Sequence, residues 1–167
     1  MSIAKITVAK TAGFCYGVER AVNMAYSAAG KYQRIFTYGP LIHNRNVVED
    51  LEKKGISVLE RIEDVLPGDA VIIRSHGVGR SVYEELEKKQ AVVIDATCPN
   101  VKRIHKLVEE CRRNGQLVLI AGDKNHPEVE GILGYGDENC FVFANCEELA
   151  TLLRKNYEIF KKGVAIL

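Results

Sequence analysis

Two cysteines of this chain are each followed, at the same distance, by a histidine that could act with them. His43 lies 28 residues after Cys15, and His126 lies 28 residues after Cys98. A cysteine thiolate is a nucleophile and a soft metal ligand, and an imidazole can move protons, ligate metals or bind anions. The matched spacing therefore indicates one arrangement of chemical groups that the chain uses twice.

The segments around these residues predict why the two pairs would meet. Each cysteine follows a β-branched run, at residues 3–8 and 91–95, and opens an amphipathic stretch typical of a helix. A helix N-terminus favours the thiolate form of a cysteine placed there. Each histidine follows a second strand-like run. Since ligands of parallel α/β sheets bind outside the carboxyl ends of the strands, we expect both pairs to face one crevice.

A third histidine, His76, also follows a strand-like run, so three imidazoles are expected just past strand ends. Imidazoles beside helix N-termini suit an anionic ligand such as phosphate or diphosphate. His105 differs, because it shares an apolar helix face with Ile104 and Val108. We interpret His105 as an interior or supporting histidine.

A carboxyl group and two hydroxyl groups are further candidates near these histidines. Glu128 lies two residues after His126 and could serve as a proton donor in the same crevice. The alternative for Glu128 is a solvated residue of a short acidic helix. Thr97 and Ser75 are weaker candidates, as hydroxyl partners of a ligand.

The other three cysteines favour structural roles. Cys111 continues the apolar stripe of its helix, which predicts a core position. Cys140 lies in a strand-like run and Cys146 near a helix start, and neither has a histidine at the repeated spacing. We expect both to be core or surface thiols. Five cysteines at uneven spacing do not indicate a disulfide framework.

Two thiolates with imidazoles could also hold a metal. Structural zinc sites usually contain close cysteine pairs such as C-x₂-C, and this sequence has none, so zinc is the least favoured possibility. Iron–sulfur clusters take cysteine thiolates and need no local pairing. Two cysteines are too few for a stable cubane cluster, so at least one ligand would have to come from elsewhere.

Composition narrows the classes of partner and compartment. The chain has 167 residues, of which 47% are apolar, enough to fill the core of one large or two small domains. Its 23 basic and 22 acidic residues give a net charge of +1, which indicates neither a nucleic acid nor a membrane surface as partner. The sequence contains no apolar run long enough to span a membrane and no signal-peptide pattern. We expect a cytoplasmic protein with reduced thiols.

Strand and helix signals alternate along the chain and predict an α/β fold with mainly parallel sheets and crossover helices. The expected strands are residues 3–9, 34–38, 56–59, 70–74, 91–96, 117–121, 140–143 and 163–167. The expected helices are residues 17–29, 44–55, 81–89, 99–115, 127–133 and 147–155. Asn44 is a suitable N-cap, and Ser81-Val-Tyr-Glu84 has the form of a capping box.

We expect two similar small lobes, residues 1–97 and residues 98–167. The first lobe would carry Cys15, His43 and His76, and the second would carry Cys98, His126 and Glu128. The second lobe looks incomplete, because a buried-type strand begins at Gly163 and the sequence then stops.

Five segments resemble, in the same order, the motifs of the LytB protein family. They are Gly13-Phe-Cys-Tyr-Gly-Val18, Ile42-His-Asn-Arg45, Ser75-His-Gly-Val78, Asp95-Ala-Thr-Cys-Pro99 and His126-Pro-Glu-Val-Glu-Gly131. Each segment alone is a weak signal, but together they are specific and span nearly the whole chain.

The resemblance implies an iron–sulfur reductase of the non-mevalonate isoprenoid pathway. Such enzymes remove the hydroxyl of 4-hydroxy-3-methylbut-2-enyl diphosphate, an allylic diphosphate, and give isopentenyl and dimethylallyl diphosphate. They hold a [4Fe–4S] cluster through three cysteines, with one iron free for the substrate hydroxyl, and receive electrons from ferredoxin or flavodoxin. By this resemblance Cys15 and Cys98 match two cluster ligands, the histidines at 43, 76 and 126 match diphosphate-binding residues, and Glu128 matches the proton-relay acid.

The resemblance also implies a departure from the family pattern. The family fold has three similar lobes around the cluster, and this sequence matches the first lobe and most of the second. The third cysteine and the serine, asparagine and threonine contacts of the family have no counterpart here. We therefore expect a fragment that is inactive alone, unless a separate polypeptide supplies the rest.

Two other classes of function use the same residues. A cofactor-free phosphate- or nucleotide-binding α/β module would need the histidines but not the cysteines. A cysteine-nucleophile transferase or hydrolase would need Cys15 and His43 within hydrogen-bond reach.

Overall fold

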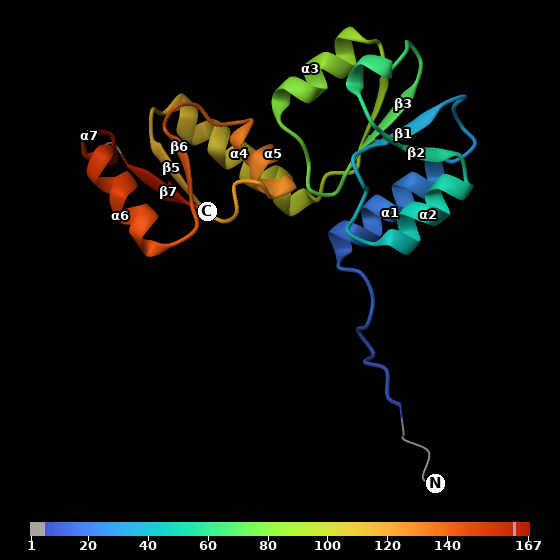
Figure 1. The fold of residues 1–167 in the computed structure, drawn as a ribbon, viewed down its shortest axis with the longest axis horizontal. Helices are drawn as coiled ribbons and strands as arrows, with labels where there is room; N and C mark the ends of the chain where they lie inside the picture. Colours follow the sequence, from blue (N-terminus) through green and yellow to red (C-terminus); the bar gives the residue numbers. More distant parts are fainter. Residues whose placement is uncertain (1–5, 162) are drawn as a thin grey trace.

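The computed structural model describes residues 6–161 and 163–167 and contains seven strands within these ranges (Figure 1). The strands are β1 (Ile35–Tyr38), β2 (Ile56–Leu59), β3 (Ala70–Ile73), β4 (Val92–Asp95), β5 (Leu117–Ala121), β6 (Cys140–Phe143) and β7 (Val164–Ile166). The helices are α1 (Tyr16–Ala28), α2 (Arg45–Lys53), the 3₁₀ helix η1 (Ile62–Asp64), α3 (Arg80–Lys88), α4 (Pro99–Arg113), α5 (Pro127–Leu133), α6 (Cys146–Lys155) and α7 (Tyr157–Phe160).

The strands form two separate parallel sheets. The first has the order β2-β1-β3-β4 and the second has the order β6-β5-β7. Every strand pairing within the described residues is parallel, and each crossover contains a helix or a helical turn. The predicted α/β fold with parallel sheets is confirmed.

Helices cover both faces of the first sheet (Figure 1). Helices α1 and α2 pack on one face, where Ile35 and Ile72 join Ala25 and Leu51 in one core cluster. Helix α3 packs on the other face through Leu86. Strand β3 lies between these layers, and all four of its residues are fully buried. A strand buried on both faces explains the continuous apolar run at this point of the sequence.

One face of the second sheet is covered by α4 and α5. Val108 of α4 and Ile132 of α5 pack against Val118 and Ile120 of β5. Helix α6 lies against β6 at the far end of the molecule (Figure 1). The core of this lobe therefore begins with α4, immediately after Cys98.

The two sheets repeat one topology. In each, the first strand of the unit lies between the second and the third. In the first sheet, β4 pairs on the outer side of β3. In the second sheet, no strand of the described part of the chain lies beside β7 in the place that corresponds to β4. Ile166 of β7 is 68% exposed. This repeat agrees with the one expected from the cysteine and histidine spacing.

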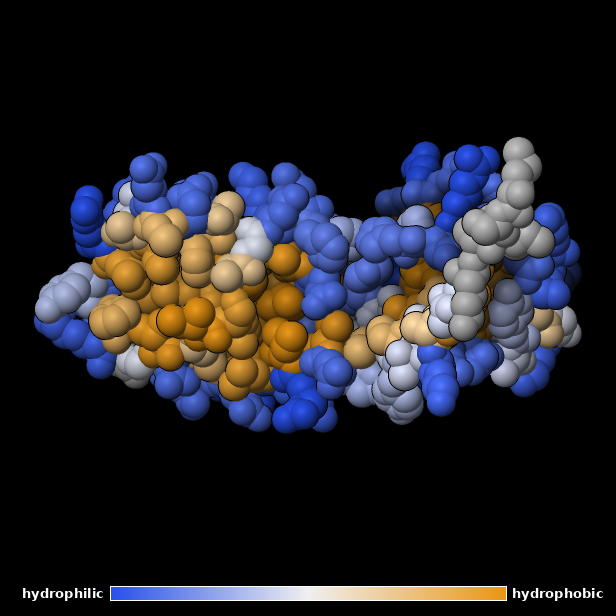
Figure 2. All heavy atoms as spheres, turned by 90° about the horizontal axis from the view of Figure 1, so that it is seen from below, coloured by the Kyte–Doolittle hydropathy of each residue, from blue (hydrophilic) through white to orange (hydrophobic). Residues whose placement is uncertain are grey.

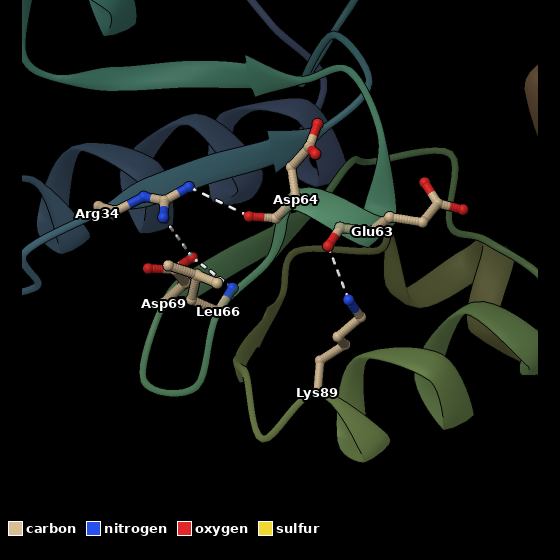
Figure 3. A network of polar contacts seen from close by, with 6 residues as sticks. All are labelled: Arg34, Glu63, Asp64, Leu66, Asp69 and Lys89. Atoms are coloured by element: carbon tan, nitrogen blue, oxygen red, sulfur yellow. Dashed lines mark hydrogen bonds and ion pairs between the residues drawn. The ribbon is translucent and has the colours of Figure 1, made fainter.

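A polar network holds the turns at the amino ends of β1 and β3 (Figure 3). Arg34 donates to the carbonyl of Asp64 at 3.3 Å and forms an ion pair with Asp69 at 3.5 Å. Asp69 also accepts a hydrogen bond from the backbone N–H of Leu66, and Lys89 donates to the carbonyl of Glu63. These contacts lie at the end of the sheet opposite the histidines and are structural.

The surface differs between the two halves of the molecule. Figure 2 shows a broad apolar area over the lobe that contains β5, β6 and β7. Leu107, Phe160 and Ile166 are exposed apolar side chains of this lobe. Among the described residues, no helix combines the length and the apolar character needed to cross a bilayer.

Most expected elements are confirmed, several to the residue, but two expectations are wrong. Residues 6–9 form no strand; Ile6 is 89% and Val8 74% exposed, so this segment has no sheet to join here, and residues 3–5 lie outside the described part. Ser81 does not cap α3. The helix begins at Arg80 after Gly79, whose Cα lies in close contact with Gly134.

Candidate functional site

Three imidazoles from different loops meet where the two lobes face each other. His43, His76 and His126 follow β1, β3 and β5, at the carboxyl ends of these strands. Their ring centroids are 4.5 Å (His43–His76), 5.7 Å (His76–His126) and 6.0 Å (His43–His126) apart. One ring nitrogen from each lies within 4.8 Å of those of the other two. The structure therefore brings together the three histidines that the sequence singled out.

Local backbone features fix each histidine. Asn44 caps α2 by accepting a hydrogen bond from the N–H of Val47, which anchors the residue after His43. Gly77 has a φ of +72°, a value that favours glycine, and turns the chain directly after His76. His126 is itself the N-cap of α5, followed by proline at the first helical position.

The charges around His76 favour an anion in this site. Burial, together with the neighbouring His43, Arg74 and His126, lowers the pKa of His76 to about 4. The Nδ1 of His76 and the Nε of Arg74 are buried without a hydrogen-bond partner within the described residues. An anionic oxygen would accept hydrogen bonds from such groups and relieve the repulsion between them. Arg74, which directly follows β3, is a candidate that we did not predict.

The hydrogen bond made by the His126 ring indicates whether the imidazole cluster suits an anion or a metal ion. Its Nδ1 accepts from the N–H of Glu128 at 3.2 Å, so in the neutral ring the proton lies on Nε2. A protonated Nε2 donates to an acceptor and has no lone pair for a metal. Three imidazoles at this spacing could hold a cation, but this tautomer suits an anion better.

The two cysteines at the repeated spacing lie at the starts of two helices whose first turns touch. Cys15 caps α1 and is exposed, whereas Cys98 caps α4 and is half-buried. A Cβ added at Gly17 would lie 2.5 Å from the sulfur of Cys98, so this sulfur packs directly on the first turn of α1. Arg20 of α1 also donates to the carbonyl of Thr97 at 3.2 Å.

The thiols do not join the imidazole group. Among the described residues, the histidine cluster is the one set of three or more possible metal ligands with this mutual spacing. No hydrogen bond links Cys15 to His43 in this part of the chain. At this spacing the group therefore consists of the three imidazoles, and the two thiols lie at the starts of α1 and α4.

Glu128 and His126 line one cavity of about 350 Å³ whose other walls are largely apolar. The Glu128 side chain is half-buried there. Ser75 and Thr97 are both buried, and their hydroxyls have partners inside the protein: Ser75 donates to the carbonyl of Leu41, and Thr97 lies 3.4 Å from the hydroxyl of Tyr83.

The remaining cysteines and His105 occupy the positions that the sequence predicted. Cys111 is buried in the core beneath β5, and burial raises the pKa of its thiol. Cys140 is half-buried, with its pKa raised by burial to about 11, and Cys146 is exposed. His105 is 4% exposed and stacks on Tyr135.

The fold and the site define an α/β protein with repeated parallel sheets and a cluster of imidazoles suited to an anion. A model of the LytB protein family matches residues 6–166, and the chain belongs to this family.

Relatives with curated names support this membership. The 4-hydroxy-3-methylbut-2-enyl diphosphate reductase of Caldanaerobacter subterraneus subsp. tengcongensis is 43% identical over 166 residues, which cover 97% of this chain and 56% of that protein. The reductase of the same name from Trichlorobacter lovleyi is 47% identical over 148 residues, 89% of this chain and 52% of that protein. The chain spans about half the length of these relatives.

Solved structures agree on the fold. One of (E)-4-hydroxy-3-methyl-but-2-enyl diphosphate reductase, the terminal enzyme of the non-mevalonate pathway, is 38% identical, with a TM-score of 0.79; the match covers 97% of this chain and 66% of that one. The reductase from Plasmodium falciparum has a TM-score of 0.80 at 24% identity, over 95% of this chain and 57% of that one, and supports the fold alone.

Proposed function

We propose that these residues form the diphosphate-binding part of a reductase that removes the hydroxyl of 4-hydroxy-3-methylbut-2-enyl diphosphate. The products would be isopentenyl and dimethylallyl diphosphate. One observation carries the proposal: one ring nitrogen from each of three imidazoles, contributed by two lobes, lies within 4.8 Å of those of the other two, and no carboxylate belongs to the group. Membership of the LytB family supports the same reaction. Because the chain spans about half of its relatives, the activity is proposed for a protein to which this chain contributes one part.

The three histidines would bind the diphosphate as hydrogen-bond donors. The Nε2–H of His126 is held in the donor tautomer by the N–H of Glu128. Arg74 adds a positive charge beside His76. Binding of an anion would raise the pKa of His76, because the charged imidazole would gain a partner of opposite charge. The lobes assigned to residues 1–97 and 98–167 would then each supply part of one binding site.

Cys15 and Cys98 would supply two thiolate ligands to a [4Fe–4S] cluster. Their position fits this role, since both cap helices and the Cys98 sulfur lies in space that only glycine at position 17 leaves open. The third ligand would come from outside the described residues. When bound, such a cluster supplies electrons and a Lewis-acidic iron. Reduced thiols require a reducing compartment, so we propose the cytoplasm, with ferredoxin or flavodoxin as electron donor.

Glu128 would hold the proton that the reaction consumes. Glu128 lines the 350 Å³ cavity together with His126 and is half-buried there. From there it can deliver a proton to a substrate whose diphosphate is held by the imidazoles.

Calorimetric titration with inorganic pyrophosphate tests the binding role. Wild-type chain should bind, and His43→Ala, His76→Ala and His126→Ala should each weaken binding about tenfold or more, since charge-assisted hydrogen bonds are each worth about 1.5–3 kcal/mol. Arg113→Ala is the control, because Arg113 is an exposed cation at the far end of α4. Equal affinity of all four variants and the wild type would overturn the proposal.

A second measurement separates the proposal from a phosphate-binding module without a cofactor. Cys15→Ser and Cys98→Ser should leave pyrophosphate binding unchanged, because neither thiol belongs to the imidazole group. After anaerobic addition of iron and sulfide to the longer protein, the same variants should lose bound iron. Full retention of iron in both variants would favour the module.

A further inference from the structure

His105 is a buried histidine to which the proposed reaction gives no task. It lies on α4, is 4% exposed, and its Nε2 has no hydrogen-bond partner within the described residues. Burial lowers its pKa to about 4, so the ring is uncharged at neutral pH. A buried imidazole without a partner costs free energy. The contacts of His105 should therefore show what the ring contributes at this point of the core.

The edge of the His105 ring lies under the loop that carries His76. A Cβ added at Gly77 would be 2.7 Å from Cε1 of His105 and 2.9 Å from Cγ2 of Thr97. Real Cβ atoms do not approach other atoms so closely. The backbone next to His76 thus rests directly on the His105 ring, and the absence of a side chain at Gly77 makes this contact possible.

The face of the same ring supports the segment that carries His126. His105 stacks on Tyr135 with ring centroids 4.3 Å apart and an angle of 18° between the planes. Tyr135 follows α5, whose N-cap is His126. Close contacts between Gly134 and Gly79 press the end of α5 against the loop after His76. One ring therefore touches both segments that deliver imidazoles to the site.

We propose that His105 is a positioning residue that sets the spacing between His76 and His126. The inference rests on the proposed anion site and adds a residue that does not touch the ligand. The flat ring fills the gap between Gly77 and Tyr135, so loss of the ring would weaken the packing between the loop and α5, leaving the contact between Gly79 and Gly134. The 5.7 Å separation of the two ligand imidazoles would then no longer be fixed.

Binding of pyrophosphate to single and double variants tests this role. We expect His105→Ala to weaken binding about tenfold, or about 1.4 kcal/mol, and Gly77→Ala to weaken it more. In the double variant, the clash of the added Cβ with the ring is gone and the one with Cγ2 of Thr97 remains, so the double variant should bind more tightly than Gly77→Ala alone. Additive losses in the double variant would contradict a direct contact between these two residues.

Two matched controls separate positioning from general loss of stability. Gly30→Ala introduces a Cβ at a φ of +73°, nearly that of Gly77, but with nothing within 4 Å. Val108→Ala removes a fully buried side chain one turn further along α4. Both should lower the stability measured by urea unfolding and bind pyrophosphate like the wild type. A loss of affinity in Val108→Ala equal to that in His105→Ala would overturn the proposal.

Nuclear magnetic resonance of the imidazole side chains decides the question without a ligand. In His105→Ala, and in Tyr135→Leu as a second variant, the ring resonances of both His76 and His126 should shift, whereas Val108→Ala should leave them in place. Unshifted rings in both variants would overturn the positioning role. If the wild-type chain bound no pyrophosphate, the proposed function would fail, while the ring resonances would still decide the role of His105.

Discussion

The sulfur of Cys98 lies against Gly17, in the place where any other residue at position 17 would put its Cβ. Cys15 caps the same helix two residues earlier. Two thiols separated by most of the first lobe in the sequence are thereby brought to the meeting point of two helix starts. This relationship makes the distance between the two thiols testable in the chain alone.

A short reagent that reacts with two thiols should join Cys15 to Cys98, as detected by mass spectrometry of the digested protein. In Gly17→Ala the added Cβ would displace the Cys98 side chain, so the yield of this cross-link should fall several-fold. Gly30→Ala, which meets no neighbour, should leave the yield unchanged. Separate alkylation of both thiols in the wild type, without any cross-link, would contradict their convergence.

Stability should fall in mild acid because of two buried histidines. The pKa values of His76 and His105 are about 4 in the folded chain, below the value near 6.5 of an unfolded one. The unfolded chain therefore binds more protons between pH 6.5 and 4, so the free energy of unfolding decreases as the pH falls through this range. We expect a loss on the order of 1–3 kcal/mol, measured by urea unfolding. In His105→Gln the free energy of unfolding should depend less steeply on pH. An unchanged slope would contradict the contribution of His105.

Asn44→Ala should destabilise the chain by about 1 kcal/mol, because the side chain caps α2 through the N–H of Val47. Asn44→Ser, which can accept the same hydrogen bond, should restore most of the loss in chemical unfolding. Since Asn44 follows His43, Asn44→Ala should also disturb the ring resonances of that histidine. Equal stability of the alanine and wild-type chains would show that the cap contributes nothing.

Ile72→Ala should cost about 2–5 kcal/mol, because Ile72 is fully buried in the central strand of the first sheet. The matched control is Ile166→Ala in the corresponding strand β7, where the side chain is 68% exposed and the change should stay within about 0.5 kcal/mol. Urea unfolding of both variants measures the difference. Similar losses at the two positions would mean that Ile166 is buried in solution.

The sequence predicts the local elements well because their signals are local. Asn44 before an apolar period and proline at residue 99 mark helix starts, and short, largely apolar runs define β2, β5 and β6 to the residue. The single turns of η1 and α7 were not predicted, because one turn contains no apolar period. At the site, the three histidines could be predicted because each one follows the end of a strand-like run.

Contacts between the lobes could not be read from the sequence. The approach of Gly134 to Gly79 depends on how the two lobes pack together, and the stacking of His105 on Tyr135 depends on how α4 and the end of α5 pack within the second lobe. Ser81 matched a capping pattern, but the packing of Gly79 started the helix earlier. Arg74 was missed because a charged residue after a strand is common, and its unpartnered Nε is visible only with the surrounding atoms in place.

Strand β7 has a practical consequence for work with this chain in solution. Among residues 6–161 and 163–167, no strand pairs with its outer side, which also carries an exposed isoleucine, and unpaired edge strands recruit strands of other molecules. Crowded samples should therefore form intermolecular sheets and precipitate, whereas dilute ones remain dispersed. Titrations and unfolding curves are best recorded at low micromolar protein, with light scattering as a monitor of growing particle size.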